Sequence, residues 1–420
     1  MNPTNIQLIG ASLFAIALLH TFSTKFFERL AHTRPAHAGL WHLLGEVEVV
    51  FGFWALVLVI AMFVVEGQST ATHYLETRNF TEPLFVFAVM VAAASKPILQ
   101  MAGGLTKGLA GSLPLPAGCA FMLVVLTLVP LMGSFITEPA AMTLAALLLR
   151  DGLYKHKHRI STRLQYATLG VLFVNISIGG TLTPYAAPPV LMVAAVWGWD
   201  LSYMFTHFGD KAALAVCINA IGLLLLFWRE LKALPPMAET NETQPPWLVT
   251  LIHLVFLAGI VVFAHHPPVF LGLFMFFLGF TAAYERYQSP LILREGLLVA
   301  FFLAGLVVLG GQQQWWLEPL LLRMDSNAVF FGATALTAIT DNAALTYLGS
   351  LVQGLSEDFK YALVAGAVTG GGLTIIANAP NPAGASILKS GFADESINAG
   401  GLILAALAPT AVAALAFKLL

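Results

Sequence analysis

Residues Ile136–Thr143 read ITEPAAMT, and residues Ile339–Thr346 read ITDNAALT. Both stretches place an acid, Glu138 or Asp341, after Ile-Thr and before Ala-Ala and Thr, in sequence that is otherwise apolar. A charged side chain in apolar membrane sequence is expensive, and it is found mainly where it has a function. The recurrence of the phrase indicates an internal duplication, with one acid in each copy.

A second phrase follows each acid in the same order. Residues Gly179–Pro189 read GGTLTPYAAPP, and residues Gly370–Pro380 read GGGLTIIANAP. Glycine and proline inside long apolar stretches are typical of the discontinuous helices of transporters. We therefore predict two broken helices, over residues 164–197 and 361–388.

The composition places the whole chain in a membrane. Of its 420 residues 58% are hydrophobic and 10% are charged, and the mean hydropathy is +0.82. Soluble domains carry about 25% charged residues, and apolar runs of about 20 residues are typical of membrane-spanning helices. The formal net charge of −2 gives no basis for binding nucleic acid. We predict an all-α polytopic membrane protein.

The charges that flank the apolar runs predict how the chain crosses the membrane. Positive charge marks cytoplasmic loops, and Lys107 and Arg150 flank an apolar pair at about residues 117–149, so this pair is expected to enter from the cytoplasm as a re-entrant hairpin. The equivalent pair, at about residues 328–355, is flanked by Glu318 and by the acidic GLSEDFK, so it is expected to enter from outside.

Counting the runs gives five spans and one hairpin in each half, residues 1–233 and 247–420, joined by a linker over residues 234–246. Because five is odd, the second half begins on the opposite side of the membrane, and we predict two inverted repeats. Early spans include the runs at residues 40–65 and 83–101. Both termini are expected to be periplasmic.

The duplicated phrases supply the candidate ion-binding residues. Hydroxyl, amide and carboxylate oxygens suit a hard cation such as sodium. The alternative for each acid is a buried cap on the helix that follows it, and glycines and prolines are often simple kinks. The predicted ion-binding residues are Thr137, Glu138, Asn175, Thr183, Thr340, Asp341, Asn342, Thr374, Asn378 and Asn381, with sodium at Glu138, Thr340, Asp341 and Asn342.

Further ionisable residues lie in the early spans. Glu46 follows His42 by four residues, so the two are expected on one helix face, and Glu48 lies on another. Lys96 lies inside the third span. Glu46 and Lys96 are candidates for a proton relay, and the alternative for each is a long side chain that reaches the membrane surface.

The order of a hairpin acid followed by a broken helix with Gly-Gly-x-Leu-Thr resembles the ion transporter superfamily, which includes D-type sodium/proton antiporters, arsenite pumps and divalent-anion symporters. ITEPAAMTLAALLL and AITDNAALTYLGSLV are most similar to a bacterial family labelled sodium/proton antiporters. The similarity covers essentially the whole chain in plan and is sharp in the two pairs of phrases. It implies a homodimer, a scaffold of early spans and a moving domain that holds the hairpins.

The symporters of this superfamily carry Ser-Asn-Thr in both hairpin tips, whereas this chain has Thr-Glu-Pro and Thr-Asp-Asn. Acids in place of neutral residues favour cation–proton exchange over binding of a di-anion. We therefore expect a transporter that exchanges sodium or lithium for protons in the bacterial inner membrane, with no cofactor and no partner besides lipids and a second copy. An isolated buried carboxylate favours its protonated form, so Glu138, beside Pro139, is the expected proton carrier and Asp341 the expected cation ligand.

Two other functions remain open from the sequence. Sodium-coupled uptake of a small anion would use helix amino-terminal dipoles to hold the anion. An intramembrane enzyme is the second, but the chain contains neither His-Glu-x-x-His nor Gly-x-Ser-x-Gly. It also lacks the nucleotide-binding motif Gly-x4-Gly-Lys-Ser/Thr, so neither an enzyme nor a nucleotide-driven pump is expected.

Overall fold

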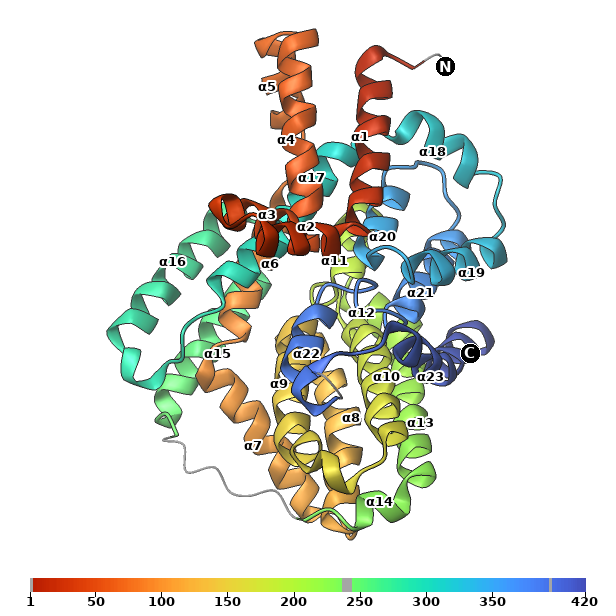
Figure 1. Cartoon of the computed structure of the whole chain (residues 1–420). Coiled ribbons are helices and arrows are strands. Elements are labelled where there is room, and N and C mark those ends of the chain that lie inside the picture. The colour runs from red at the N-terminus through yellow and green to blue at the C-terminus, as the bar shows by residue number, and fades with distance from the viewer. Residues whose placement is uncertain (1–2, 236–243, 393–394) are drawn as a thin grey trace.

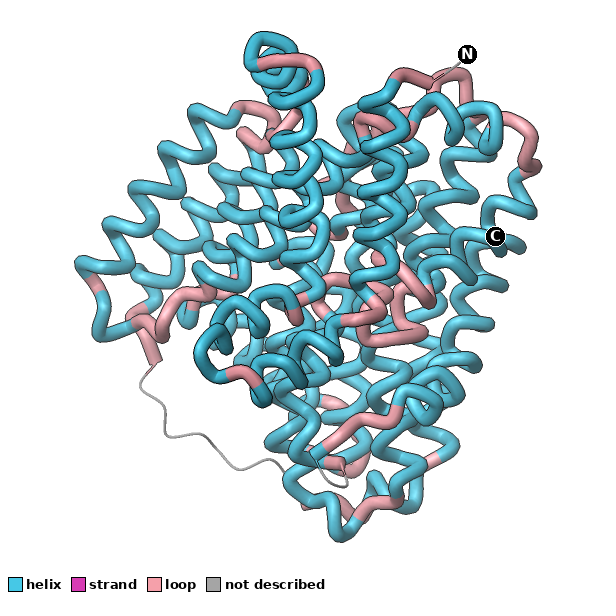
Figure 2. Tube along the Cα trace, turned by 45° about the horizontal axis from the view of Figure 1, so that its top comes forward, coloured by secondary structure: helices cyan, strands magenta, loops and turns pink. Residues whose placement is uncertain are grey.

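The computed structural model describes residues 3–235, 244–392 and 395–420. Within these ranges the chain is helical and contains no strand (Figures 1 and 2). Six helices among the described residues are long and apolar enough to cross a membrane, and up to seven if a bent pair counts as one span. Four shorter helices, of 10–17 residues, are also apolar. The protein is an all-α polytopic membrane protein, as the composition predicts.

A first bundle consists of helices that come early in each half of the chain. In this bundle α4 packs against α1 and α17, and α6 packs against α17, α16 and α15. Contact between α4 and α17 is close because Gly305 faces the α4 backbone at Gly52, and a side chain there would overlap it. The members are α1 (Asn5–Thr21), α4 (Val47–Val65), α6 (Thr81–Ala93), α15 (Trp247–Val262), α16 (Pro267–Ala283) and α17 (Leu293–Gly310).

A second bundle holds both duplicated phrases. In it α11 packs against α20 and α22 packs against α9, so the late part of each broken helix contacts the hairpin of the other half. The members are α8 (Ala117–Ile136), α9 (Glu138–Gly152), α10 (Thr162–Gly179), α11 (Pro188–Trp197), α13 (Asp210–Leu226), α19 (Ser326–Thr337), α20 (Asn342–Ser350), α21 (Glu357–Gly370), α22 (Asn381–Leu388) and α23 (Ala399–Leu419).

The helices end where the duplicated phrases lie. In the first half α10 ends at Gly179, a 3-10 turn covers Gly180–Leu182, and α11 begins at Pro188. In the second half α21 ends at Gly370 and α22 begins at Asn381. We call residues 180–187 the first break and residues 371–380 the second break. The first hairpin, α8 and α9, lies in the lower part of Figure 1, and the second hairpin, α19 and α20, lies in the upper part.

The two hairpins differ in length. Helix α8 has 20 residues and is among the helices long enough to cross a membrane, whereas α19 has 12. Proline lies inside α8 at Pro130, and α9 begins with Glu138-Pro139, where proline needs no amide donor.

Two early runs that the sequence predicts as single spans are divided. The run at residues 40–65 splits into α3 (Ala38–Leu44) and α4, because the chain is extended at Glu46. His42 and Glu46 therefore do not share a helix face, and that expectation is wrong. The run at residues 83–101 splits into α6 and α7 (Lys96–Ser112), which meet at 63°. Pro97 provides the reason, since proline cannot continue the hydrogen bonding of a helix that precedes it.

Short helices connect these elements. They are α2 (Thr24–Thr33), α5 (Gln68–Glu76), α12 (Leu201–Met204), α14 (Trp228–Lys232) and α18 (Gln314–Leu321). Most of the expected linker, residues 236–243, lies outside the described residues.

Candidate ion-binding site

The first hairpin tip, residues 136–139, is built around a strained residue. Thr137 has φ 72° and ψ 150°, a backbone conformation that is normally confined to glycine and costs on the order of 1–3 kcal/mol. This turn places Glu138 at the first position of α9, fully buried. The amide of Glu138 donates to the carbonyl of Ala186 in the first break, at 3.4 Å. The tip is thus held against the broken helix of its own half.

The carboxylate of Glu138 lies inside the second bundle. It packs against Gly180, where a Cβ would come within 2.5 Å of Oε1. Its Oε2 accepts a hydrogen bond from the side-chain amide of Asn378, in the second break, at 2.9 Å. Its Oε1 is buried and has no hydrogen-bond partner. A buried polar atom without a partner is costly, so this oxygen is suited to a proton or a cation.

The second hairpin tip, residues 340–343, uses its acid differently. Asp341 precedes α20 as its N-cap, and its Oδ1 accepts from the amides of Ala343 at 2.8 Å and Ala344 at 3.3 Å. Asn342 is the first residue of α20, and its amide donates to the carbonyl of Ala377 in the second break, at 3.1 Å. The side chain of Asn342 is fully buried, and neither of its polar atoms has a hydrogen-bond partner.

These contacts show that Glu138 corresponds to Asn342 in the structure, and Thr137 to Asp341. Both Glu138 and Asn342 begin a helix, and both donate a backbone bond to an alanine of the neighbouring break. The side chain of Glu138 lies against Gly180, and that of Asn342 lies against Gly371.

Two further hydrogen bonds agree with this correspondence between the residues of the two tips. The hydroxyl of Thr183 donates to the carbonyl of Ser134 at 2.6 Å, and the hydroxyl of Thr374 donates to the carbonyl of Ala338 at 2.9 Å. The expectation that the two acids occupy equivalent positions is therefore wrong by one residue. The reason is that Asp341 acts as a cap, so α20 begins one residue later in its phrase than α9 does.

The threonines and asparagines of the predicted site have several different environments. Thr183 and Thr374 tie each break to its hairpin, as described above. Thr340 lies half-buried in the turn before Asp341, and its amide donates to the carbonyl of Leu336. Asn381 donates to the carbonyls of Gly371 at 2.8 Å and Thr374 at 2.9 Å, while its Oδ1 is buried without a partner.

Asn175 lies elsewhere. Its side-chain amide donates to the carbonyls of Leu126 and Val216, and its Oδ1 accepts from Asn219 at 2.9 Å. These bonds link α10 to α8 and α13 and use the polar atoms of the side chain. Asn175 therefore has a structural role in the second bundle, and its prediction as an ion ligand is not supported by this position.

A small cavity adjoins the second hairpin tip. Its volume is about 20 Å³, enough for about one water molecule or one bare cation, and its polar lining is Asp341, Asn378 and Glu48. The corresponding cavity at the first tip is about 10 Å³ and is lined by Thr137 and Tyr185 together with apolar residues, without a carboxylate. The two tips thus present different surroundings to an ion.

The early ionisable residues lie at different depths. Glu46 forms an ion pair with Arg294 of α17, and the Arg294 side chain is 67% exposed. Lys96, expected inside a span, is the half-buried first residue of α7, at the bend. Neither is among the residues that line the cavities at the tips. Glu48, which was not among the residues predicted for the proton relay, lines the cavity beside Asp341.

Sequence reasoning also missed two serines near the breaks. The hydroxyl of Ser134 donates to the carbonyl of Gly179 at 2.7 Å and accepts from the amide of Leu182 at 2.9 Å. Ser177 donates to the carbonyl of Val368 at 2.7 Å, which joins α10 to α21. Ser177 stands two residues before Gly179 in the sequence, so its nearness to the first break could have been noticed.

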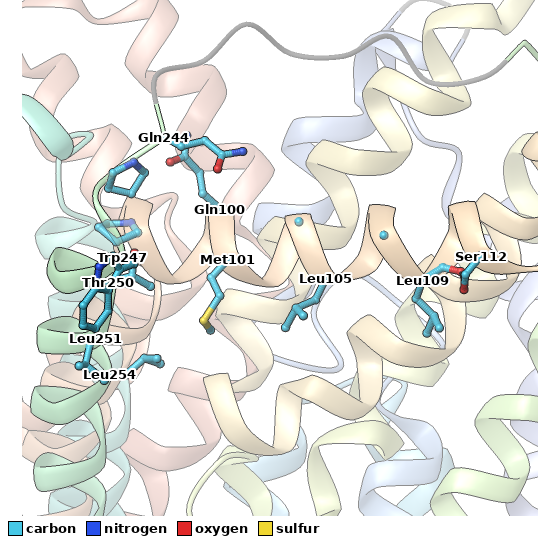
Figure 3. A pocket seen from close by; sticks show the side chains of 14 residues that line it. Gln100, Met101, Leu105, Leu109, Ser112, Gln244, Trp247, Thr250, Leu251 and Leu254 are labelled. Carbon is cyan, nitrogen blue, oxygen red and sulfur yellow. Dashed lines mark hydrogen bonds between the residues drawn. The ribbon is translucent and has the colours of Figure 1, made fainter.

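A much larger cavity, of about 900 Å³, lies between α7 and α15 (Figure 3). Its lining is mainly apolar, with Met101, Leu105 and Trp247 among the labelled side chains, and it includes no carboxylate. It is not a candidate ion site. Among the described residues there is also no group of three or more His, Cys, Asp or Glu side chains that would hold a transition metal.

A family model described as "Putative Na+/H+ antiporter" matches residues 5–420. Among curated proteins, none matches the chain. The matched range includes both hairpins and both breaks.

Proposed function

The chain belongs to the family described as "Putative Na+/H+ antiporter", and we propose that it exchanges sodium or lithium for protons across the bacterial cytoplasmic membrane by alternating access. The observation that carries the proposal is the pair of buried acids, Glu138 and Asp341, at two hairpin tips that meet the breaks of two helices. A carboxylate that binds either a cation or a proton couples the two fluxes without a nucleotide.

The two acids have different proposed roles. Asp341 lines the small cavity and holds its Oδ1 on two backbone amides, so it is the proposed cation ligand. Glu138 is fully buried and has a single side-chain donor, Asn378, so it is the proposed proton carrier. Asn378 contacts Glu138 and also lines the cavity beside Asp341, which gives a physical link between the two acids.

Alternating access is proposed to come from inverted repeats. The matching hydrogen bonds of the two tips, from Glu138 to Ala186 and from Asn342 to Ala377, support a duplicated unit. Opposite orientation in the membrane has a direct test. Cysteines placed near Lys157 and near Ser356 should react with an impermeant thiol reagent from opposite sides of the membrane. Labelling of both from one side would contradict the inversion.

We also propose that the first bundle is a fixed scaffold and forms a homodimer. On α4 one face, with Leu58 and Met62, is buried, while Leu56, Ile60 and Val64 lie exposed along another. An exposed apolar face on a membrane helix meets either lipid or a second copy. An Ile60→Cys variant should form a disulfide between copies in the membrane, whereas Leu336→Cys, exposed on the second hairpin, should not.

Sodium-coupled uptake of an anion is the alternative. An anion would bind to free amides at a helix amino terminus. At α20 the amides of Ala343 and Ala344 already bond to the carboxylate of Asp341. At α9 the carboxylate of Glu138 stands in the first turn. Both tips therefore repel an anion, and this favours exchange of cations.

The test of the proposed function is transport by the purified protein in liposomes. A pH gradient, monitored with a pH-sensitive dye, should dissipate when sodium or lithium is added and should not respond to potassium. Sodium-dependent uptake of a labelled anion, without proton movement, would instead support the symporter. Failure of every cation to move protons, in liposomes that retain their gradient, would contradict antiport.

A further inference from the structure

The small cavity beside Asp341 lies between the two bundles. Val47 and Glu48 of α4 and Val299 and Phe302 of α17 line it from the first bundle. Asp341 and the second break, including Asn378, line it from the second bundle. Two carboxylates on different bundles therefore face a space for about one water molecule or cation.

On the basis of the proposed exchange function, we infer that Glu48 is the second carboxylate of the Asp341 site. A cation in this cavity is held between Glu48 and Asp341, and a proton shared by the pair replaces it when the cation leaves. Replacing one monovalent cation by one proton leaves the total charge of the pair unchanged. Neither half-reaction needs a further reactant, because the proton is exchanged with water.

The charge of Glu48 is not compensated in the way that Glu46 is. Glu46 pairs with Arg294, and among the described residues no ion pair involves Glu48. The charged groups with which Glu48 interacts electrostatically are Glu46, Arg294 and Asp341. Arg294 is paired with Glu46, and the charged side chain that lines the cavity together with Glu48 is Asp341. Two ionised carboxylates in such a place repel each other unless a proton or a cation lies between them.

A buried amide gives independent support for a cation at this place. Asn378 is fully buried and lines the same cavity, and its Oδ1 has no hydrogen-bond partner. Its side-chain nitrogen is used in the bond to Glu138, so the side chain presents its neutral oxygen as the remaining polar atom. Carboxylate and amide oxygens are the ligands that hard cations prefer.

The position of Glu48 links release of the cation to movement of the two bundles. Glu48 belongs to α4, while Asp341 belongs to the second hairpin, so the proposed site is complete only when the two bundles are in contact here. Any movement of the second hairpin away from α4 separates the carboxylates and weakens the site. Binding of the cation and the relative position of the bundles are therefore coupled.

The experiment counts protons released when sodium binds to the purified full-length protein in weakly buffered detergent solution. Glu48→Gln should raise the sodium concentration for half-maximal release by about tenfold, because a charged ligand is lost, and should lower the number of protons released. Glu48→Asp keeps the carboxylate but moves it away from the cavity, because aspartate is one methylene shorter. Proton release should persist, and sodium affinity should fall by a smaller factor than in Glu48→Gln. The matched control is Glu295→Gln, an exposed acid in the first turn of α17.

Each result has a distinct meaning. A Glu48→Gln protein that responds like Glu295→Gln would overturn the inference while leaving the exchange function intact. If Glu48→Gln does not fold, wild-type sodium affinity in Glu48→Asp would overturn it equally. Failure of the wild-type protein to release protons on sodium addition would instead contradict the proposed function itself.

Discussion

The two hairpin tips have matching backbones, but they carry their acidic side chain at different positions. At the first tip the cap position holds Thr137 and the first helical residue is the acid Glu138, whereas at the second tip the cap is the acid Asp341 and the first helical residue is Asn342. An acid at a cap is stabilised by amides of its own helix. An acid one residue later points inward and depends on a donor from elsewhere, here Asn378.

This difference separates a carboxylate that is held by its own helix from a carboxylate that is held by the other half of the chain. Asp341 accepts from the amides of Ala343 and Ala344, which belong to its own α20 and are close in sequence. Glu138 obtains its donor from residue 378, in the other half of the chain. The hydrogen bond to Glu138 therefore joins the two halves, whereas the two amide bonds to Asp341 lie within one half.

The largest expected effect is that of Asp341→Asn. Asparagine is an equally good helix cap, so stability should change by less than about 1 kcal/mol. One of the two carboxylates that line the cavity is lost, so sodium-dependent proton release should fall to the background of empty liposomes. The check is the liposome assay together with thermal unfolding. Retained exchange would show that Asp341 is only a cap.

The next effect is that of Glu138→Gln, which removes the charge at the other tip. The cavity beside Asp341 keeps its lining, so sodium binding should remain measurable, and its dependence on pH should weaken to the part that comes from Glu48 and Asp341. Sodium binding to the purified variant, measured by calorimetry at several pH values, checks this. Full pH-dependent exchange in this variant would mean that Glu138 carries no transported proton.

The double variant Asp341→Asn with Asn342→Asp gives the second tip the order of the first. The cap remains, while the acid moves from the cavity to the inner position against Gly371. Sodium affinity should fall by at least about tenfold, since the charged ligand leaves the cavity. Calorimetry measures the sodium affinity of the double variant and of the wild type. Unchanged affinity would contradict the one-residue shift between the two tips.

A smaller effect is expected for Asn378→Leu, which removes the donor to Glu138. A hydrogen bond to the ionised carboxylate favours the charged form, so its loss makes the proton harder to release. The pH dependence of exchange should move to more alkaline pH by about one to two units, as hydrogen bonds to charged groups contribute about 1.5–3 kcal/mol. Because Asn378 also lines the cavity, the control is Asn381→Leu, which removes a buried amide that does not contact Glu138.

The smallest expected effect tests whether equivalent hydrogen bonds hold the two breaks to their hairpins. Thr183→Val and Thr374→Val each remove one hydroxyl bond between a break and its hairpin. Because the two bonds are equivalent in the structure, each variant should lose about 1 kcal/mol of stability, and both by the same amount within error. Thermal unfolding in detergent measures this. A large loss for one variant only would mean that the breaks are not held alike.

The sequence predicts those features of the structure that depend on neighbouring residues, and it does not predict those that depend on contacts between distant segments. The class of fold followed from hydropathy, because transfer of apolar side chains out of water depends on composition over some twenty residues. The ends of α10 and α21 followed from Gly179, Pro188 and Gly370, since glycine and proline act on their own backbone. That Glu138 and Asp341 lie buried at helix starts was also predictable from their apolar neighbours.

Contacts between distant segments determine which residues of the two hairpin tips correspond. The alignment of ITEPAAMT with ITDNAALT pairs two acids, but the caps and the bonds to Ala186 and Ala377 shift that pairing by one residue. Residue type cannot reveal such a shift, because it depends on which oxygen meets which amide after packing.

The same holds for the side chains around the tips. Asn175 is satisfied by carbonyls of two other helices, Glu46 by Arg294, and Glu48 is brought to Asp341 by the packing of α4 and α17 against the second break. Composition and local residue patterns predict a membrane protein with two buried acids and two broken helices. The partners that Glu138 and Glu48 meet, Asn378 and Asp341, cannot be found from local patterns, because they lie far along the chain and are brought there by packing.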